Sequence, residues 1–195
     1  MIFGFDFDNT LINYDKIFYS IAVKRLLIKK KIKKDKSSIK KILFREKKIK
    51  EWTKLQSEVY SREIYKATPN KKLILLLKFL KKKKIKFYII SHKTQFPYYG
   101  KKIDLHKISK DWLRINIFNK RNRLGNCKYY FESTIKKKIQ RIRKLKITHF
   151  VDDLSEILNL MPTSVAGILY KKKIFELNKI KNLVKSELNA QPLWK

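Results

Sequence analysis

The chain is poor in residues that cross-link or interrupt a fold. Its 195 residues include one cysteine, four glycines and four prolines. With Cys127 alone an internal disulfide is excluded, so we expect a cytoplasmic protein in which this residue is a small, semi-buried side chain and not a reactive thiol. Residues 1–6 lack the basic and long apolar regions of a secretory signal. The apolar run 73–80 is interrupted by Lys78 and is too short to span a membrane.

Acidic residues are also scarce. There are 16 of them against 50 lysines and arginines, and the formal net charge is +34. A nucleic-acid partner would explain such a charge, and so would compositional drift in an A+T-rich genome. Lysine far outnumbers arginine, although arginine suits bidentate phosphate recognition better, which favours drift. A nucleic-acid partner therefore stays open but is not favoured, and we expect the lysine-rich runs 29–36 and 81–84 to be solvated helix ends.

Short apolar runs alternate with amphipathic segments along most of the chain. The apolar runs predict buried strands, listed with a weaker fifth candidate at the end: Ile2–Phe7, Ile85–Ile90, Ile147–Val151, Val165–Tyr170 and Tyr129–Phe131. Helical patterns lie between them, at Asn70–Lys82, Asp104–Ile115, Thr134–Leu145 and Ser155–Leu160. This alternation predicts an α/β fold, a Rossmann-like parallel sheet flanked by helices.

One interval, residues 13–69, departs from the alternation. It shows helical periodicity at Ile17–Lys29 and Ser38–Tyr65 and no convincing strand. Connections of this length are usually folded or functional in their own right. We therefore predict a small helical insertion (residues 13–69) in a core formed by residues 1–12 and 70–195. Its helices either cover the ligand crevice or simply pack on the core, and we favour the covering role.

Two acidic residues follow the first predicted strand. Asp6 and Asp8 should lie on the same side of the chain, at the carboxyl edge where open α/β sheets bind ligands. Buried carboxylates are costly unless they are neutralised, and Mg²⁺ is a natural partner for them. A helix-capping role would explain Asp8 or Asn9 but not Asp6, which sits inside the apolar run.

A second acidic pair, Asp152 and Asp153, follows another predicted strand. Two such strand ends side by side would form a site for a hard cation, although Asp153 or Ser155 could instead cap the following helix. A third strand ends in Ser91, whose hydroxyl could donate to a phosphoryl oxygen. A cationic side chain is also needed near these carboxylates to hold the phosphate and the nucleophile. Lys136–Lys138, on the predicted helix before the acidic pair, are the candidates, and composition alone does not distinguish between them.

Together these motifs resemble the haloacid dehalogenase (HAD) superfamily. The sequence Asp6-Phe7-Asp8-Asn9-Thr10 is similar to its first motif, DxDx[TV]. Ser91 matches the Thr or Ser of the second motif, and Asp152 with Asp153 matches the acidic pair of the fourth. For the lysine of the third motif we choose Lys138, with Lys137 as the alternative. The order and spacing of the motifs cover roughly residues 1–170.

The resemblance implies an Mg²⁺-dependent phosphatase. Asp6 would attack phosphorus and form an aspartyl-phosphate, and Asp8 would act as general acid and then general base. Mg²⁺ would be held by Asp6, the backbone carbonyl of Asp8 and the acidic pair, with Asp152 as our first choice of direct ligand. Ser91 and Lys138 would stabilise the phosphoryl oxygens. Dehalogenases of the superfamily lack the second aspartate, so Asp8 favours phosphoryl transfer.

The expected substrate is a small phosphorylated metabolite, because the superfamily places a helical cap where the helical insertion lies. Further segments, 52–60 and 91–94, resemble an uncharacterised bacterial subgroup with no substrate that we can assign. The residues predicted to bind the substrate are Asn9, Thr10, His92, Lys93 and Gln56. A phosphotransferase, a phosphatase acting on nucleotides or nucleic-acid ends, and a non-catalytic binding protein remain alternatives. The sequence leaves the oligomeric state open.

Overall fold

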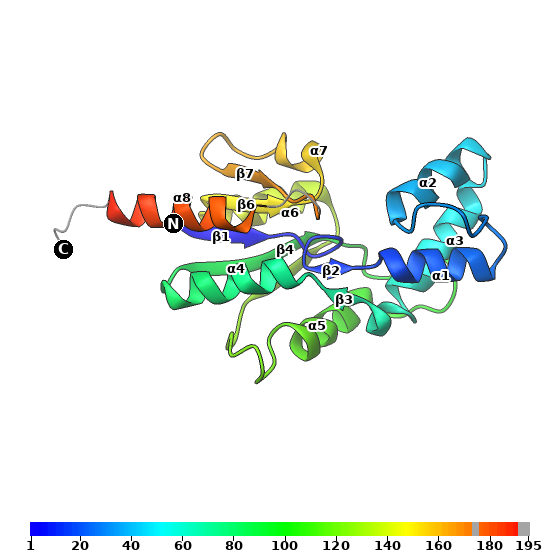
Figure 1. Cartoon of the computed structure of the whole chain (residues 1–195), viewed down its shortest axis with the longest axis horizontal. Helices are drawn as coiled ribbons and strands as arrows, with labels where there is room; N and C mark the ends of the chain where they lie inside the picture. The colour runs from blue at the N-terminus through cyan, green and yellow to red at the C-terminus, as the bar shows by residue number, and fades with distance from the viewer. Residues whose placement is uncertain (173–175, 191–195) are drawn as a thin grey trace.

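The computed structural model describes residues 1–172 and 176–190 (Figure 1). Its centre is a five-stranded sheet with the strand order β5-β4-β1-β6-β7, and every neighbouring pair is parallel. The strands are β1 (Ile2–Phe5), β4 (Lys86–His92), β5 (Tyr129–Glu132), β6 (His149–Asp152) and β7 (Ala166–Leu169). Each overlaps one predicted strand, and the predicted α/β parallel sheet is confirmed.

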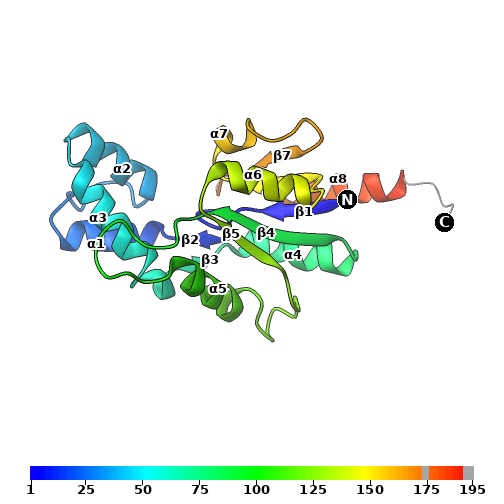
Figure 2. The same ribbon diagram turned by 180° about the vertical axis from the view of Figure 1, so that it is seen from behind.

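Helices cover both faces of this sheet. Those of the core are α4 (Lys71–Lys82), α5 (Leu105–Asn116), α6 (Ile135–Lys144), α7 (Ser155–Leu158) and α8 (Leu177–Asn189). Figures 1 and 2 show α4 and α8 side by side on one face and α6 on the opposite face. None of the helices described is long and apolar enough to cross a membrane.

Strand β1 lies at the centre of the sheet because its residues tolerate burial on both faces. Phe3 and Phe5 are fully buried, as is Phe150 on the neighbouring strand β6. Gly4 lies between the two phenylalanines and pairs with Phe150 in the register of β1 and β6. The absence of a side chain at Gly4 leaves room for the Phe150 ring, which packs directly over it. This close approach holds the two strands that end in acidic residues next to each other.

The helical insertion contains α1 (Asp15–Lys24), α2 (Lys36–Arg45), α3 (Ile49–Tyr60) and a short 3₁₀ turn (Ile64–Lys66). These helices lie beyond the carboxyl ends of the strands, to the right in Figure 1.

Two predicted helix ranges of the insertion were wrong. The first helix ends at Lys24 and not at Lys29, because Leu26 takes a left-handed conformation (φ 56°) and the chain turns there. Lys47 does the same and divides the predicted helix Ser38–Tyr65 into α2 and α3. Periodicity continued through both points because buried apolar residues, Ile28 and Trp52, follow the two turns.

The insertion is joined to the core by a small antiparallel ribbon that the sequence did not predict. It consists of β2 (Ile12–Asn13) and β3 (Thr68–Pro69). Asn70 fastens the junction, because its backbone N–H donates to Leu11 O at 2.9 Å and its side chain donates to Thr10 O. Strands this short carry no pattern in the sequence. The boundaries 13 and 69 that we assigned to the insertion stay a prediction.

We predict that Gly4→Ala destabilises the protein. The added Cβ would overlap the Phe150 ring and come within 3.2 Å of Ile147 Cγ2. Overpacking of this kind costs about 1–3 kcal/mol of unfolding free energy, which urea denaturation measures. Gly167→Ala is the matched control in another strand, because the nearest atom to its Cβ, Leu158 Cβ, lies 3.3 Å away, without the overlap found at Gly4. Equal effects at the two positions would contradict the prediction.

Candidate active site

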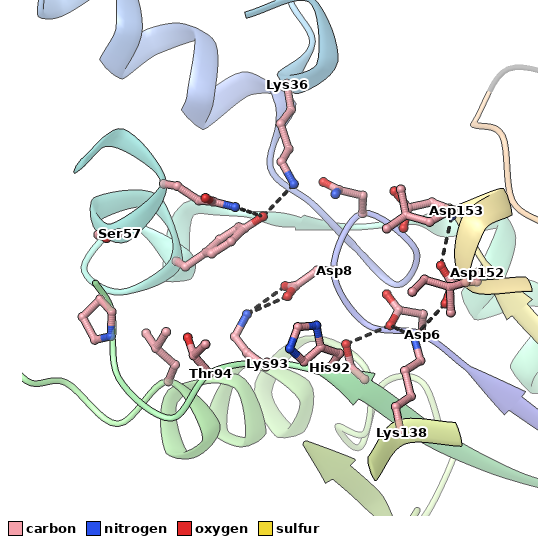
Figure 3. A pocket seen from close by; sticks show the side chains of 18 of the residues that line it. Asp6, Asp8, Lys36, Ser57, His92, Lys93, Thr94, Lys138, Asp152 and Asp153 are labelled. Carbon is pink, nitrogen blue, oxygen red and sulfur yellow. Dashed lines mark hydrogen bonds and ion pairs between the residues drawn. The ribbon is translucent and has the colours of Figure 1, made fainter. Parts of the chain in front are cut away.

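Three adjacent parallel strands deliver the predicted motifs to one edge of the sheet (Figure 3). Asp6 follows β1, Ser91 lies near the end of β4, and Asp152 ends β6. The backbone N–H of Asp6 donates to Val151 O at 2.8 Å, which continues the pairing of β1 with β6 beyond the last residue of β1. Because β1 lies between β4 and β6, the Asp6 side chain is flanked by residues of both neighbours.

The carboxylate of Asp6 is held by two donors. Ser91 Oγ donates to Asp6 Oδ1 at 2.8 Å, and Lys138 Nζ donates to the same oxygen at 2.6 Å. Lys138 Nζ also donates to Asp152 Oδ2 at 2.7 Å. Within residues 1–172 and 176–190, Asp6 Oδ2 has no hydrogen-bond donor. One oxygen is therefore fixed, and the other is free to react or to bind a ligand.

The orientation of helix α6 points Lys138, and not the neighbouring Lys137, toward Asp6. Thr134 caps the helix by accepting from the backbone N–H of Lys137 at 3.2 Å. From this start, Lys138 points inward and is 2% exposed, whereas the ammonium of Lys137 stays near Ser133 on the surface. The structure thus places the preferred residue, and not the alternative Lys137, beside Asp6.

Three carboxylates form a cluster at this edge of the sheet, and Lys138 contacts two of them, Asp6 and Asp152. One oxygen each from Asp6, Asp152 and Asp153 lies within 4.8 Å of the others. Burial raises the pKa of Asp6 well above its ordinary value; Lys138 opposes this rise, and the two neighbouring carboxylates add to it. Burial likewise raises the pKa of Asp153 to about 6, with Asp152 as the next cause.

The charge of this cluster fits a divalent cation. Burial lowers the pKa of Lys138, but Asp6 and Asp152 raise it by more, so that it stays an ammonium. Three ionised carboxylates and one ammonium leave two negative charges in a buried space, which one Mg²⁺ would balance. Asp6, Asp152 and Asp153 are the residues that would hold it. The Asp8 side chain lies outside the cluster, and a contribution from its backbone carbonyl stays a prediction.

Neither Asp153 nor Ser155 caps the following helix. The N-cap of α7 is Leu154, without a side-chain hydrogen bond to the helix. Asp152 Oδ1 instead accepts from the backbone N–H of Leu154 at 3.0 Å, which fixes the first residue of the acidic pair. The capping explanation for this pair is therefore wrong.

Asp8 is oriented by two side chains that the sequence analysis did not connect with it. Lys93 Nζ donates to both Asp8 oxygens, at 2.9 and 2.8 Å, and Tyr14 Oη donates to Oδ1 at 2.7 Å. Burial, and then the charge of Asp8, raise the pKa of Tyr14, so this hydroxyl stays a neutral donor. These contacts hold Asp8 beside the cavity and away from the carboxylate cluster.

A cavity of about 290 Å³ opens above Asp6, between the sheet edge and the helical insertion. Of the predicted substrate-binding residues, Asn9, His92, Lys93 and Gln56 line it. The Asn9 side-chain oxygen is buried and accepts no hydrogen bond from any residue that the structure describes. Thr10 is fully buried behind the cavity and donates to Asp153 Oδ1 at 3.5 Å. Whether these residues bind a substrate stays a prediction.

Lys36 is a cavity residue that the sequence did not predict. We expected the run 29–36 to be solvated, but the Lys36 ammonium points into the cavity and donates to Tyr60 Oη at 2.7 Å. In so lysine-rich a chain nothing distinguished this residue. Tyr60 also lines the cavity, whereas Trp52 of the same helix is 5% exposed and stacks on Phe18.

Cys127 lies away from this cavity and is half-buried, as expected. Burial raises the pKa of its thiol to about 12. A thiol that is so difficult to ionise is a poor nucleophile.

We predict that Asp153→Asn stabilises the metal-free protein at pH 8. The pKa of Asp153 lies above its ordinary 3.8, so its contribution to stability is complete below about pH 4 and is lost as the pH rises through about 6. At pH 8 the variant should exceed wild type by about 1–3 kcal/mol in urea unfolding, and the difference should shrink toward about pH 5. Mg²⁺ should narrow the gap at pH 8, because it stabilises ionised Asp153. A variant that is less stable than wild type at both pH values contradicts this prediction.

Comparison with known proteins adds one solved structure. No protein-family model matches the chain, and neither does any curated protein. A crystal structure of a HAD-superfamily hydrolase from Ehrlichia chaffeensis superposes with a TM-score of 0.52 over 96% of this chain and 97% of that chain, at 18% sequence identity. At this identity the likeness concerns the fold. The chain therefore has the fold of a HAD-superfamily hydrolase, as its motifs predicted.

Proposed function

We propose that the protein is an Mg²⁺-dependent phosphatase that hydrolyses a small phosphorylated metabolite through an aspartyl-phosphate at Asp6. The observation behind this proposal is the asymmetric environment of the Asp6 carboxylate. Ser91 and Lys138 both bind Oδ1, at 2.8 and 2.6 Å, and leave Oδ2 facing a cavity that also contains Asp8. A nucleophile beside a separate acid–base group is what phosphoryl transfer through a covalent intermediate requires.

In the first step Asp6 Oδ2 attacks phosphorus, and the bond to the ester oxygen breaks. The leaving oxygen takes a proton from Asp8, which Lys93 and Tyr14 hold beside the cavity. Ser91 and Lys138 donate to phosphoryl oxygens as negative charge shifts onto them. A bound Mg²⁺ would supply further neutralisation, so that an anionic nucleophile can approach an anionic phosphate.

In the second step Asp8 removes a proton from water, whose oxygen attacks the phosphorus of the aspartyl-phosphate. Inorganic phosphate leaves and the Asp6 carboxylate is regenerated. Another alcohol in place of water would make the enzyme a phosphotransferase, because the first step is shared. We propose the hydrolase, which needs only water as the acceptor.

The size of the site supports a small substrate. A cavity of about 290 Å³ is at the lower end of ligand pockets, and helices α2 and α3 lie over it. Enclosure of this kind excludes water from the reacting groups when a ligand fills it. A cytoplasmic location remains a prediction from the sequence.

We predict that Asp6→Asn abolishes turnover. The amide is nearly the same size as the carboxylate but cannot attack phosphorus, so hydrolysis of p-nitrophenyl phosphate with Mg²⁺ should fall by a factor of about a thousand or more. Wild-type turnover should require the metal. Mg²⁺ with orthovanadate, a phosphate mimic, should raise the melting temperature of the wild type.

Asp111→Asn is the control for this experiment. Asp111 lies on α5, does not line the cavity, and pairs with the exposed Arg114 at 3.5 Å. The activity of the variant should therefore match wild type. Full activity in Asp6→Asn would overturn the nucleophile assignment. An inactive wild type that is also not stabilised by Mg²⁺ and vanadate would favour a non-catalytic binding protein.

A further inference from the structure

Lys36 brings a cation from the helical insertion into the cavity. It is the first residue of α2, and its backbone N–H donates to Asp15 Oδ1 at 3.1 Å. Asp35 caps the same helix by accepting from the Ser38 N–H at 2.8 Å. Two carboxylates therefore fix the backbone at this point, and the Lys36 side chain extends toward the cavity (Figure 3).

The Lys36 ammonium is stabilised without an ion pair. It donates to Tyr60 Oη at 2.7 Å and lies 5.4 and 5.6 Å from the ring centres of Tyr60 and Phe18. No carboxylate in residues 1–172 or 176–190 lies within salt-bridge distance of it. Burial lowers the pKa of Lys36, but Tyr60 and the more distant Asp8 and Asp153 together raise it, so the group stays charged.

Other cations of the cavity are already engaged. Lys93 is neutralised by Asp8, and Lys138 is shared by Asp6 and Asp152. Lys36 thus provides a positive charge on the side of the cavity opposite the carboxylate cluster, next to the amide of Gln56. A phosphoryl group bound at Asp6 would direct the rest of its molecule toward this charge.

We propose that Lys36, with Tyr60 and Gln56, forms a subsite for a second anionic group of the substrate. The substrate class is then a small phosphate monoester that also carries a carboxylate or a second phosphate. This inference rests on the proposed phosphatase function and narrows its substrates. An anion would give Lys36 the charged partner that it lacks, while Tyr60 Oη and the Gln56 amide would donate further hydrogen bonds.

The test uses pairs of substrates that differ only in the second anion. Phosphoglycolate against hydroxyethyl phosphate tests a carboxylate, and propanediol bisphosphate against hydroxypropyl phosphate tests a phosphate. For each pair the ratio of kcat/KM values, anionic over neutral, is measured with Mg²⁺. In wild type we expect a ratio of roughly ten or more for at least one pair, and Lys36→Met should reduce that ratio about ten-fold, mainly through KM.

Two control variants distinguish loss of the Lys36 charge from a general effect of substitution on folding. Lys36→Arg keeps the charge and should keep most of the preference. Lys41→Met removes an exposed lysine of the same helix and should leave the ratio unchanged. A wild type without preference in either pair, or a Lys36→Met variant that slows both members of a pair equally, would overturn the subsite.

Binding measurements distinguish this failure from failure of the proposed function. Calorimetric titration of Asp6→Asn protein with the same compounds and Mg²⁺ reports binding without turnover. If wild type hydrolyses none of the compounds while Asp6→Asn still binds the anionic members more tightly, through Lys36, the phosphatase proposal fails and the subsite stands. If hydrolysis occurs without any preference for the anionic member of a pair, the subsite proposal fails and the phosphatase proposal stands.

Discussion

The structure depends on how the charge of its buried carboxylates is balanced at the end of β1. Asp6 is 6% and Asp152 1% exposed, and Lys138, itself 2% exposed, bridges them. Carboxylates so deeply buried are tolerated only with cationic partners. One ammonium does not balance the charge of three carboxylates. The folded site therefore has a deficit of positive charge. The same deficit that costs stability makes the site suited to a divalent cation.

The sheet makes this arrangement rigid. Phe3 and Phe5 are buried on one face of β1, and the Phe150 ring packs on Gly4 on the other face, so β1 and β6 cannot shift relative to each other without opening the core. Asp6 and Asp152 therefore meet at a fixed separation. Preorganisation of this kind lets a site stabilise a transition state without rearrangement at the moment of reaction.

The helical insertion gives the cavity two ends of different charge. Acidic groups gather on the sheet side, and the Lys36 ammonium approaches from α2. Between them, Lys93 and Tyr14 hold Asp8, with Lys93 supplied by the core and Tyr14 by the insertion. Asp8 is thus oriented by both parts of the chain, and movement of the helical insertion would act on Asp8 as well as on a ligand in the cavity.

The sequence by itself determined the alternation of strands and helices and the acidic motifs after β1 and β6. Both are local features: hydrophobic periodicity, and a carboxylate within or directly after an apolar run, can be read without knowing which distant residues they contact. It did not determine where α1 ends or that Lys47 divides α2 from α3, since both depend on single left-handed residues. The resemblance to the superfamily already favoured Lys138 over Lys137, and the structure buries Lys138 beside Asp6. Only the tertiary structure joined Lys93 and Tyr14 to Asp8 and turned Lys36 into the cavity. Each of these depends on contacts between residues far apart in the chain, and in so lysine-rich a sequence only burial and a partner distinguish a functional lysine from a solvated one.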